Sequence, residues 1–294
     1  RVFDASEFSP VDVRQLEAGG VVVVLVSQSG ETKDCQRVLA WAKERSFLTV
    51  GVVNAVGSWL ARQTDCGIYL NAGREVGVAS TKSFTSQCVV LTLLALWLCQ
   101  GSTQWSRLTE WCPRVYNIAE VFSRNMAALE ASAQALVAPV SRQRSIFLLG
   151  RGYAHAIALE GALKLKELTC KNVEGYAGGA LKHGPFAVLG ADATVCLHCW
   201  EGPDRDYMLS AAGQVSSREA QVVLFHNASS QKGEAEVQRR LPQATLVAVS
   251  AADEWSASLV SVVLYQYLAF YLARSCGLNP DQPRHLAKVV TVDG

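Results

Sequence analysis

Short, unbroken apolar runs recur along the chain, and longer segments of mixed polarity separate them. Val21–Val26 and Leu48–Val53 are the first two runs, and both are rich in β-branched residues. Runs of this kind are typical of strands that are buried on both faces of a parallel sheet. The pattern predicts strands at 21–26, 48–53, 67–71, 145–149, 194–198, 221–225 and 245–249.

The segments between these runs favour helices. We predict helical segments at 31–45, 59–64, 81–99, 154–168 and 260–276. Strands that alternate with helices indicate a parallel sheet covered on both faces, so the predicted fold class is α/β with doubly wound parallel sheets. Residues 101–142 are more polar and helical, and we interpret them as a connector that packs between two domains.

The two halves of the chain share one pattern of strand, polar loop, helix, strand, short piece, strand and long apolar helix. The second half opens with an additional strand, a glycine turn and a helix, which the first half lacks. A repeat that lacks its first unit on one side predicts that the first domain is truncated at its amino end. The predicted boundaries are 1–100 for this domain, 101–142 for the connector, 143–276 for the second domain and 277–294 for a tail.

Composition narrows the class of protein. The 294 residues are 50% hydrophobic and 18% charged, which suits about two globular domains. The net charge is +1 and no basic run occurs, so neither nucleic acid nor an anionic membrane is an expected partner. The longest apolar run, Cys88–Cys99, is shorter than the ~20 residues of a membrane span. Residues 1–10 contain no apolar core of a signal peptide.

The cysteines indicate a reducing compartment. There are nine, an odd number, and they form no Cys-x-x-Cys pair. We interpret them as reduced thiols of a cytoplasmic protein. Cys196, His198 and Cys199 lie close in sequence, but their spacing favours a strand over a ligand knuckle, so no metal is expected.

The segment Ser27-Gln28-Ser29-Gly30-Glu31-Thr32 follows the first predicted strand and opens a helix. A helix start offers N–H groups and the positive end of its dipole, which together suit a phosphate. Ser27, Ser29 and Thr32 add hydroxyl groups, and Gln28 adds an amide. The alternative is an ordinary helix start in which Ser29 is the N-cap and Thr32 lies near the third helical position.

The predicted helix at 154–168 carries a narrow line of charge. Glu160, Lys164 and Glu167 stand at positions i, i+4 and i+7, and most of the remaining positions are apolar or glycine. One interpretation is a solvated stripe with i,i+4 ion pairs. The other is a line that faces a pocket, where a carboxylate beside an ammonium group transfers protons.

Two further residues qualify as candidates on weaker grounds. His183 lies in the loop Lys182-His183-Gly184-Pro185, and histidine titrates near neutral pH. Lys288 lies in the tail that follows Pro280 and Pro283. For both residues the alternative is simple exposure to solvent.

These segments together resemble the isomerase part of the glutamine–fructose-6-phosphate aminotransferase family, which consists of two sugar isomerase (SIS) domains. The motifs similar to the first domain are Ser27–Thr32, Asn71–Gly73 and Val78–Lys82. Those similar to the second domain and tail are Gly150–Gly152, Leu159–Glu167, Leu181–Pro185, Pro283–Arg284 and Leu286–Lys288. They occur in order over nearly the whole chain and are specific as a set, although the first motif alone occurs in many SIS proteins.

The resemblance implies a reaction and its substrates. The family makes glucosamine 6-phosphate from fructose 6-phosphate and ammonia, without a metal or organic cofactor. The ammonia comes from glutamine in a separate glutaminase domain, which is expected upstream of this chain because no amino-terminal cysteine nucleophile is present. The resemblance also implies a homodimer or higher homo-oligomer.

The resemblance assigns a role to each candidate residue. Ser27, Gln28, Ser29 and Thr32 hold the sugar phosphate, and Val78 and Ser80 line the sugar site. Glu167 moves a proton between C1 and C2, and Lys164 assists it. His183 helps to open the sugar ring and is expected to come from the neighbouring subunit. Lys288, on a tail that closes the active site, forms a Schiff base with the open ketose.

The sequence departs from the family pattern at two points. The opening strand of the first domain and its Cys-Gly-Thr-Ser loop have no counterpart, and Ala180 stands where the family usually has a glutamate. A second function class, a SIS protein that senses sugar phosphate without turnover, therefore stays open. The joint presence of Lys164, Glu167, His183 and Lys288 favours the enzyme. We expect poor turnover from residues 1–294 alone. A SIS-type transcription regulator would need a helix-turn-helix and a basic face, and we identify neither.

Overall fold

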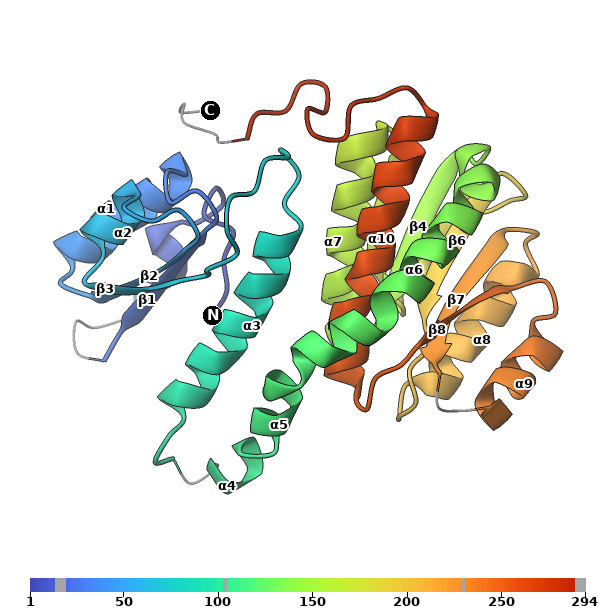
Figure 1. The fold of residues 1–294 in the computed structure, drawn as a ribbon, viewed down its shortest axis with the longest axis horizontal. Coiled ribbons are helices and arrows are strands. Elements are labelled where there is room, and N and C mark those ends of the chain that lie inside the picture. Colours follow the sequence, from blue (N-terminus) through green and yellow to red (C-terminus); the bar gives the residue numbers. More distant parts are fainter. Residues whose placement is uncertain (14–19, 103–104, 229–230, 289–294) are drawn as a thin grey trace. The chain divides into compact units, whose positions relative to one another are not determined.

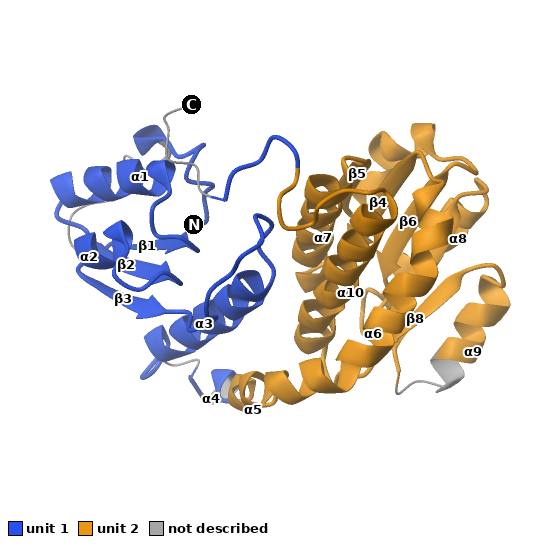
Figure 2. Ribbon diagram, turned by 45° about the horizontal axis from the view of Figure 1, so that its top comes forward, with its two compact units in different colours: residues 1–109, 284–294 blue, residues 110–283 orange. Residues whose placement is uncertain are grey.

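A computed structural model describes residues 1–13, 20–102, 105–228 and 231–288 (Figure 1). The chain divides into two compact units (Figure 2). Unit 1 comprises Arg1–Thr109 together with Arg284–Gly294, and unit 2 comprises Glu110–Pro283. Each unit is built around its own parallel sheet.

Unit 1 contains a three-stranded parallel sheet in the order β1-β2-β3, formed by β1 (Val22–Ser27), β2 (Leu48–Val53) and β3 (Cys66–Tyr69). Two helices, α1 (Lys33–Glu44) and α2 (Trp59–Gln63), pack on one face through a small core. That core consists of Leu25, Cys35, Val38, Leu39, Val53 and Leu60. A 3-10 turn (Pro10–Val13), α3 (Lys82–Leu98) and α4 (Trp105–Leu108) complete the unit.

The other face of this sheet borders an apolar groove of about 430 Å³. Val24, Val50 and Ile68 line it from the sheet, and Val90, Leu94 and Trp97 line it from α3. Trp97 is 64% exposed. The alternation of side chains along each strand explains the two environments, since Val23 and Leu25 face the core while Val22 and Val24 face the groove.

Unit 2 contains a five-stranded, fully parallel sheet in the order β5-β4-β6-β7-β8. The strands are β4 (Ser145–Gly150), β5 (Asn172–Ala177), β6 (Ala193–His198), β7 (Gln221–Asn227) and β8 (Thr245–Val249). The helices are α5 (Trp111–Tyr116), α6 (Ile118–Ser141), α7 (Tyr153–Thr169), α8 (Arg205–Ser216), α9 (Gln231–Arg240) and α10 (Glu254–Ser275). Two 3-10 turns, Ala180–His183 and Pro185–Val188, follow β5.

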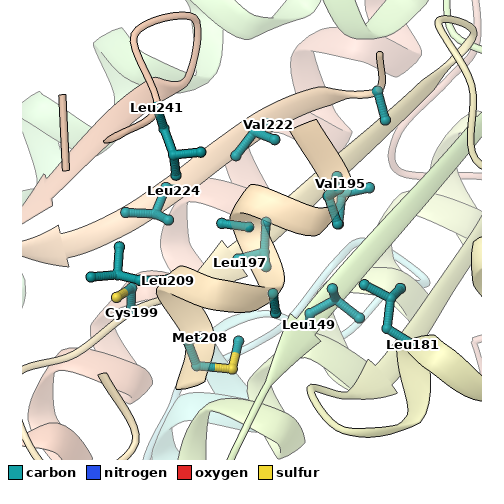
Figure 3. Close-up of a cluster of buried hydrophobic side chains, with 14 of the residues drawn as sticks. Leu149, Leu181, Val195, Leu197, Cys199, Met208, Leu209, Val222, Leu224 and Leu241 are labelled. Carbon is teal, nitrogen blue, oxygen red and sulfur yellow. The ribbon is translucent and has the colours of Figure 1, made fainter. Parts of the chain in front are cut away.

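Helices cover both faces of the unit 2 sheet. On one face α8 and α9 enclose a large apolar cluster that includes Leu149, Leu197, Leu209 and Leu224 (Figure 3). On the other face lie α6, α7 and α10 (Figure 1). At Gly161 of α7 a Cβ atom would lie 2.4 Å from the ring of Tyr265, so glycine permits the close approach of α7 and α10.

The α10 helix is the single described helix that is long and apolar enough to cross a membrane. In its most apolar window, 78% of the residues are buried inside the protein. It packs against α6 and α7 and is therefore explained as a core helix of unit 2. Lys82–Leu98, which contains the longest apolar run of the sequence, is a shorter apolar helix.

Most of the predicted strands and helices are confirmed, and the differences include one unpredicted strand and two helix starts. The strand β5 was not expected, because its sequence Asn-Val-Glu-Gly-Tyr-Ala has no apolar run. The helix α1 begins at Lys33 and not at Glu31, because residues 27–32 form a loop. The helix α10 begins at Glu254, six residues before the predicted start, and Asp253 caps it by accepting a hydrogen bond from the Ser256 N–H at 3.0 Å.

Candidate functional site

The loop after β1 forms a compact set of hydroxyl groups at the start of α1. The Ser27 and Thr32 hydroxyls are 2.8 Å apart, and the Ser27 oxygen accepts the Gly30 N–H at 3.0 Å. The Ser29 hydroxyl accepts the Glu31 N–H at 3.1 Å. The loop therefore holds its own hydroxyls in place beside the N-terminus of a twelve-residue helix.

Two contacts fix the path of this loop. Gly30 has φ +67°, and a Cβ atom there would lie 2.0 Å from the Ser58 hydroxyl. Both the conformation and the space thus require glycine. The Gln28 carbonyl accepts the backbone N–H groups of Asn54 and Ala55, which ties the loop to the end of β2.

The ordinary N-cap alternative is wrong for this helix. Thr32 is the N-cap, and its side chain makes no capping hydrogen bond. Ser29 lies three residues before the N-cap, so its hydroxyl serves the loop and not the helix end. The first turn of α1 has N–H groups without acceptors inside the helix, as every helix start does.

A second polar cluster in unit 1 joins the segment before α3 to the tail. The Lys288 ammonium group donates to the Gly77 carbonyl and lies 3.5 Å from a carboxylate oxygen of Glu75. Gly77 directly precedes Val78. The Ser80 hydroxyl lies 2.7 Å from that of Ser83, which is itself bonded to Glu75. Lys288 is thus linked to Ser80 through Glu75 and Ser83, and the carbonyl that Lys288 binds directly precedes Val78.

Glu75 is buried and charged in this arrangement. Burial alone would raise the pKa of its carboxyl group, but hydrogen bonds from Ser83 and Thr81 and the charge of Lys288 outweigh it and lower the pKa. Sequence reasoning missed this residue, since a single glutamate in an irregular segment carries no periodic signal. Its contacts come from residues six, eight and 213 positions away in the chain.

In unit 2, the charged line on α7 forms one buried ion-pair cluster. The Lys164 ammonium group lies 2.8 Å from the Glu167 carboxylate and 3.6 Å from the Glu160 carboxylate. The Lys164 side chain is 4% exposed. The solvated-stripe alternative therefore does not hold. Leu159 and Leu163, which the sequence marked as fit for burial, are exposed instead.

His183 lies at the end of the first 3-10 turn after β5 and is exposed. Leu181 anchors this turn in the unit 2 core, and Gly184 with φ +147° follows the histidine. Within a single chain, this geometry agrees with the alternative that His183 is simply exposed to solvent. The role across subunits that the resemblance assigns to His183 stays a prediction.

His198 is a buried core residue whose ring nitrogens both have hydrogen-bond partners. Its Nδ1–H donates to the Leu149 carbonyl at 3.0 Å, which leaves Nε2 to accept from the Tyr265 hydroxyl at 3.3 Å. Burial lowers the pKa of this histidine to about 4. Among the described residues, no group of three histidine, cysteine or acidic side chains is placed to hold a metal ion.

Comparison with known proteins now adds to this geometry. The SIS domain matches residues 2–97 and 140–272 of the chain. The chain belongs to the SIS domain family. The two matched segments fall on the two sheets described above.

Curated relatives that resemble the chain include glutamine–fructose-6-phosphate aminotransferases. It is 37% identical to glutamine–fructose-6-phosphate aminotransferase of Chlorobaculum tepidum over 92% of this chain and 43% of the relative. It is also 37% identical to glutamine–fructose-6-phosphate aminotransferase 1 of Rattus norvegicus, over 92% of this chain and 39% of the relative. The chain thus spans about two fifths of the length of these relatives.

Solved structures agree in fold. The C-terminal domain of glucosamine-fructose-6-phosphate aminotransferase from Francisella tularensis superposes with a TM-score of 0.82 at 28% identity, covering 93% of this chain and 76% of that one. A tagatose-6-phosphate ketose/aldose isomerase from Escherichia coli superposes at 0.73 with 16% identity, over 94% and 74% of the chains. The latter likeness shows the fold alone.

The two SIS repeats differ at equivalent loops. The loop after β6, which matches the Ser27–Thr32 loop after β1 in position, contains Glu201 and Asp204. Together with Glu254 these carboxylates line a small cavity of about 20 Å³, and Arg151 pairs with Asp204 at 3.2 Å. Carboxylates at this loop repel a phosphate anion, so the hydroxyl-rich loop of unit 1 is the better phosphate candidate.

Proposed function

We propose that this chain is the sugar-phosphate isomerase part of a glutamine–fructose-6-phosphate aminotransferase. It converts fructose 6-phosphate and ammonia to glucosamine 6-phosphate, with the ammonia supplied from glutamine by a glutaminase domain. The observation that carries the proposal is the Lys164 ammonium group, buried between the carboxylates of Glu160 and Glu167. A protein that merely binds sugar phosphate needs the loop at 27–32 and has no use for this cluster.

The phosphate loop anchors the substrate in this proposal. The hydroxyls of Ser27, Ser29 and Thr32, the Gln28 amide and the α1 N-terminus hold the phosphate group. Val78 and Ser80 line the sugar. Fixing the phosphate places C1 and C2 at a constant position, which makes proton transfer between them efficient.

The remaining residues perform the chemistry. His183, from a neighbouring subunit of a homodimer or higher oligomer, assists ring opening by proton transfer. The Lys288 ammonium group gives up a proton, and its amine attacks C2 of the open ketose, from which water leaves to give a Schiff base. Ammonia then displaces the lysine from C2, which puts the product nitrogen on C2 and frees the Lys288 amine. Glu167 removes a proton from C1 as a carboxylate and returns it to C2 as the protonated acid, and the Lys164 charge stabilises the carboxylate form before and after this transfer. The tail at 277–294 closes the site, and the reaction takes place in the cytoplasm without a cofactor.

The acid–base role of Glu167 is tested by Glu167→Gln. The neutral amide keeps the size of the side chain but cannot accept the C1 proton. Exchange of the C1 proton of fructose 6-phosphate with deuterium from solvent should slow by ~10²-fold or more, the usual effect of losing a general base. Calorimetric affinity for fructose 6-phosphate should stay near that of the wild type.

A matched control is Glu130→Gln, which changes another partly buried carboxylate that accepts a hydrogen bond from Tyr271. It should leave the exchange rate unchanged. Exchange at the wild-type rate in Glu167→Gln would remove Glu167 from the mechanism.

A further inference from the structure

The carboxylate of Glu75 joins the start of a long helix to the tail lysine. One oxygen accepts the Thr81 N–H at 2.8 Å and the Ser83 N–H at 3.4 Å, both at the beginning of α3. The other oxygen accepts from the Ser83 hydroxyl and lies 3.5 Å from the Lys288 ammonium group. Glu75 is therefore the point at which the α3 N-terminus and residues 284–288 meet within unit 1.

Capping of α3 accounts for half of these contacts. Thr81 is the N-cap of α3 and makes no capping hydrogen bond with its own side chain. The Glu75 carboxylate takes that place, and its negative charge complements the positive end of the helix. A capping role alone, however, gives no reason for a contact with a lysine 213 residues away in the sequence.

The contact between Glu75 and Lys288 can hold the lysine in one position. The Glu75 side chain is 4% exposed and fixed by four donor groups of Thr81 and Ser83, so its position is rigid. The Lys288 side chain is 28% exposed and has a second acceptor in the Gly77 carbonyl. Two fixed acceptors, a carboxylate and a carbonyl, thus define where the amine lies relative to Val78 and Ser80.

We infer that Glu75 is a positioning residue that docks Lys288, and with it the tail, beside the Val78–Ser80 segment. The inference rests on the proposed function, in which the Lys288 amine is the nucleophile that attacks the ketose. Glu75 itself touches no reacting atom in this scheme. It acts by holding the amine at the substrate site before the sugar arrives.

The docking is measured without any sugar. Brief acetylation of the free protein with an N-hydroxysuccinimide ester, followed by peptide mass spectrometry, gives the rate at each lysine. In the wild type, Lys288 should react at least about threefold more slowly than exposed Lys43, which serves as the internal reference. In Glu75→Gln the Lys288 rate should rise to that of Lys43. Equal rates in the wild type would overturn the inference even if the variant does not fold.

Two further variants separate docking from capping. Ser83→Ala removes a donor to Glu75 but keeps the ion pair, so it should lower the melting temperature without raising the Lys288 rate. Glu130→Gln should change neither quantity. A Lys288 rate in Glu75→Gln that equals the wild-type rate would show that Glu75 is a helix cap alone.

The consequence for chemistry is measured by reductive trapping with fructose 6-phosphate and cyanoborohydride. The wild type should form an adduct at Lys288, and Glu75→Gln should form it about tenfold more slowly with unchanged affinity for inorganic phosphate. An absent wild-type adduct would contradict the proposed function and leave the docking result standing. An adduct formed equally fast in both proteins would contradict the inference and leave the proposed function standing.

Discussion

At the scale of single residues, the neutral histidine in the unit 2 core makes stability depend on pH. Burial lowers the pKa of His198 to about 4, against an ordinary value of 6.5. In the unfolded chain the His198 ring therefore becomes protonated below about pH 6.5, whereas in the folded chain it stays neutral down to about pH 4. Its contribution to stability is complete above pH 6.5 and falls as the pH drops from 6.5 towards 4, by roughly 3 kcal/mol in all.

This dependence is measured by urea unfolding at pH 7.5 and pH 5. The variant His198→Gln carries no titrating ring. Its free energy of unfolding should therefore decrease less from pH 7.5 to pH 5 than that of the wild type. The difference between the two losses should be ~2 kcal/mol. Parallel losses in both proteins would assign the acid sensitivity to other groups.

Single residues also show where sequence reasoning reaches its limit. The line Glu160, Lys164 and Glu167 was visible because helical geometry makes spacing equivalent to proximity. Glu75 was not visible because its partners Thr81, Ser83 and Lys288 are assembled by an irregular segment and a tail. The sequence predicted a strand at His198, but the burial of its ring and its bond to Tyr265 depend on tertiary packing.

At the scale of elements, the close contact of α7 with α10 depends on Gly161. A Cβ atom there would lie 2.4 Å from the Tyr265 ring and 2.7 Å from a methyl group of Leu148. Gly161→Ala should therefore lower the free energy of unfolding by about 1–3 kcal/mol, as overpacking of a core does. Chemical denaturation measures this change.

Gly213 in α8 provides the matched control, because a Cβ atom there meets nothing within 4 Å. Gly213→Ala should raise the free energy of unfolding by ~0.5–1 kcal/mol, since alanine restricts the unfolded chain and favours a helix. If both variants shifted stability in the same direction, helix propensity and not packing would govern α7.

Element prediction succeeded where a strand carries an apolar run, even at a sheet edge, and failed at β5, which has none. The runs at 48–53, 194–198 and 221–225 became central or near-central strands with buried side chains. The edge strand β5 has one fully buried side chain, Val173, so its sequence never needed an apolar run. The start of α1 was misplaced because the same residue types that open helices also build the loop at 27–32.

At the scale of the whole molecule, the two units are unequal in a way that predicts separate stabilities. Unit 2 has five strands with helices on both faces, whereas unit 1 has three strands and an apolar groove on one face. Unit 1 buries less apolar surface and has β1 as an edge strand, while its counterpart β6 is paired on both sides. We therefore expect two thermal transitions, with unit 1 the first to unfold.

Ligands should raise the melting temperatures of these two transitions by different amounts. The pattern tests which residues contact the phosphate and which contact the sugar. In the proposed function inorganic phosphate binds the Ser27–Thr32 loop, so it should raise the unit 1 transition alone. At a hundredfold excess over its dissociation constant, a ligand adds about 2.7 kcal/mol, or ~8–15 °C for a unit of this size. Fructose 6-phosphate, which the proposed function also assigns to Lys164 and Glu167, should raise both transitions.

Scanning calorimetry measures the two shifts, and hydrogen exchange of peptides from each unit identifies which transition is which. In Lys164→Gln, fructose 6-phosphate should still raise the unit 1 transition, because the phosphate loop is intact, but its effect on unit 2 should shrink. A shift of unit 2 by inorganic phosphate would mean that phosphate has a second site outside the 27–32 loop. A sugar phosphate that leaves unit 2 unmoved in the wild type would separate the α7 cluster from the substrate, because a ligand stabilises what it binds in the folded state.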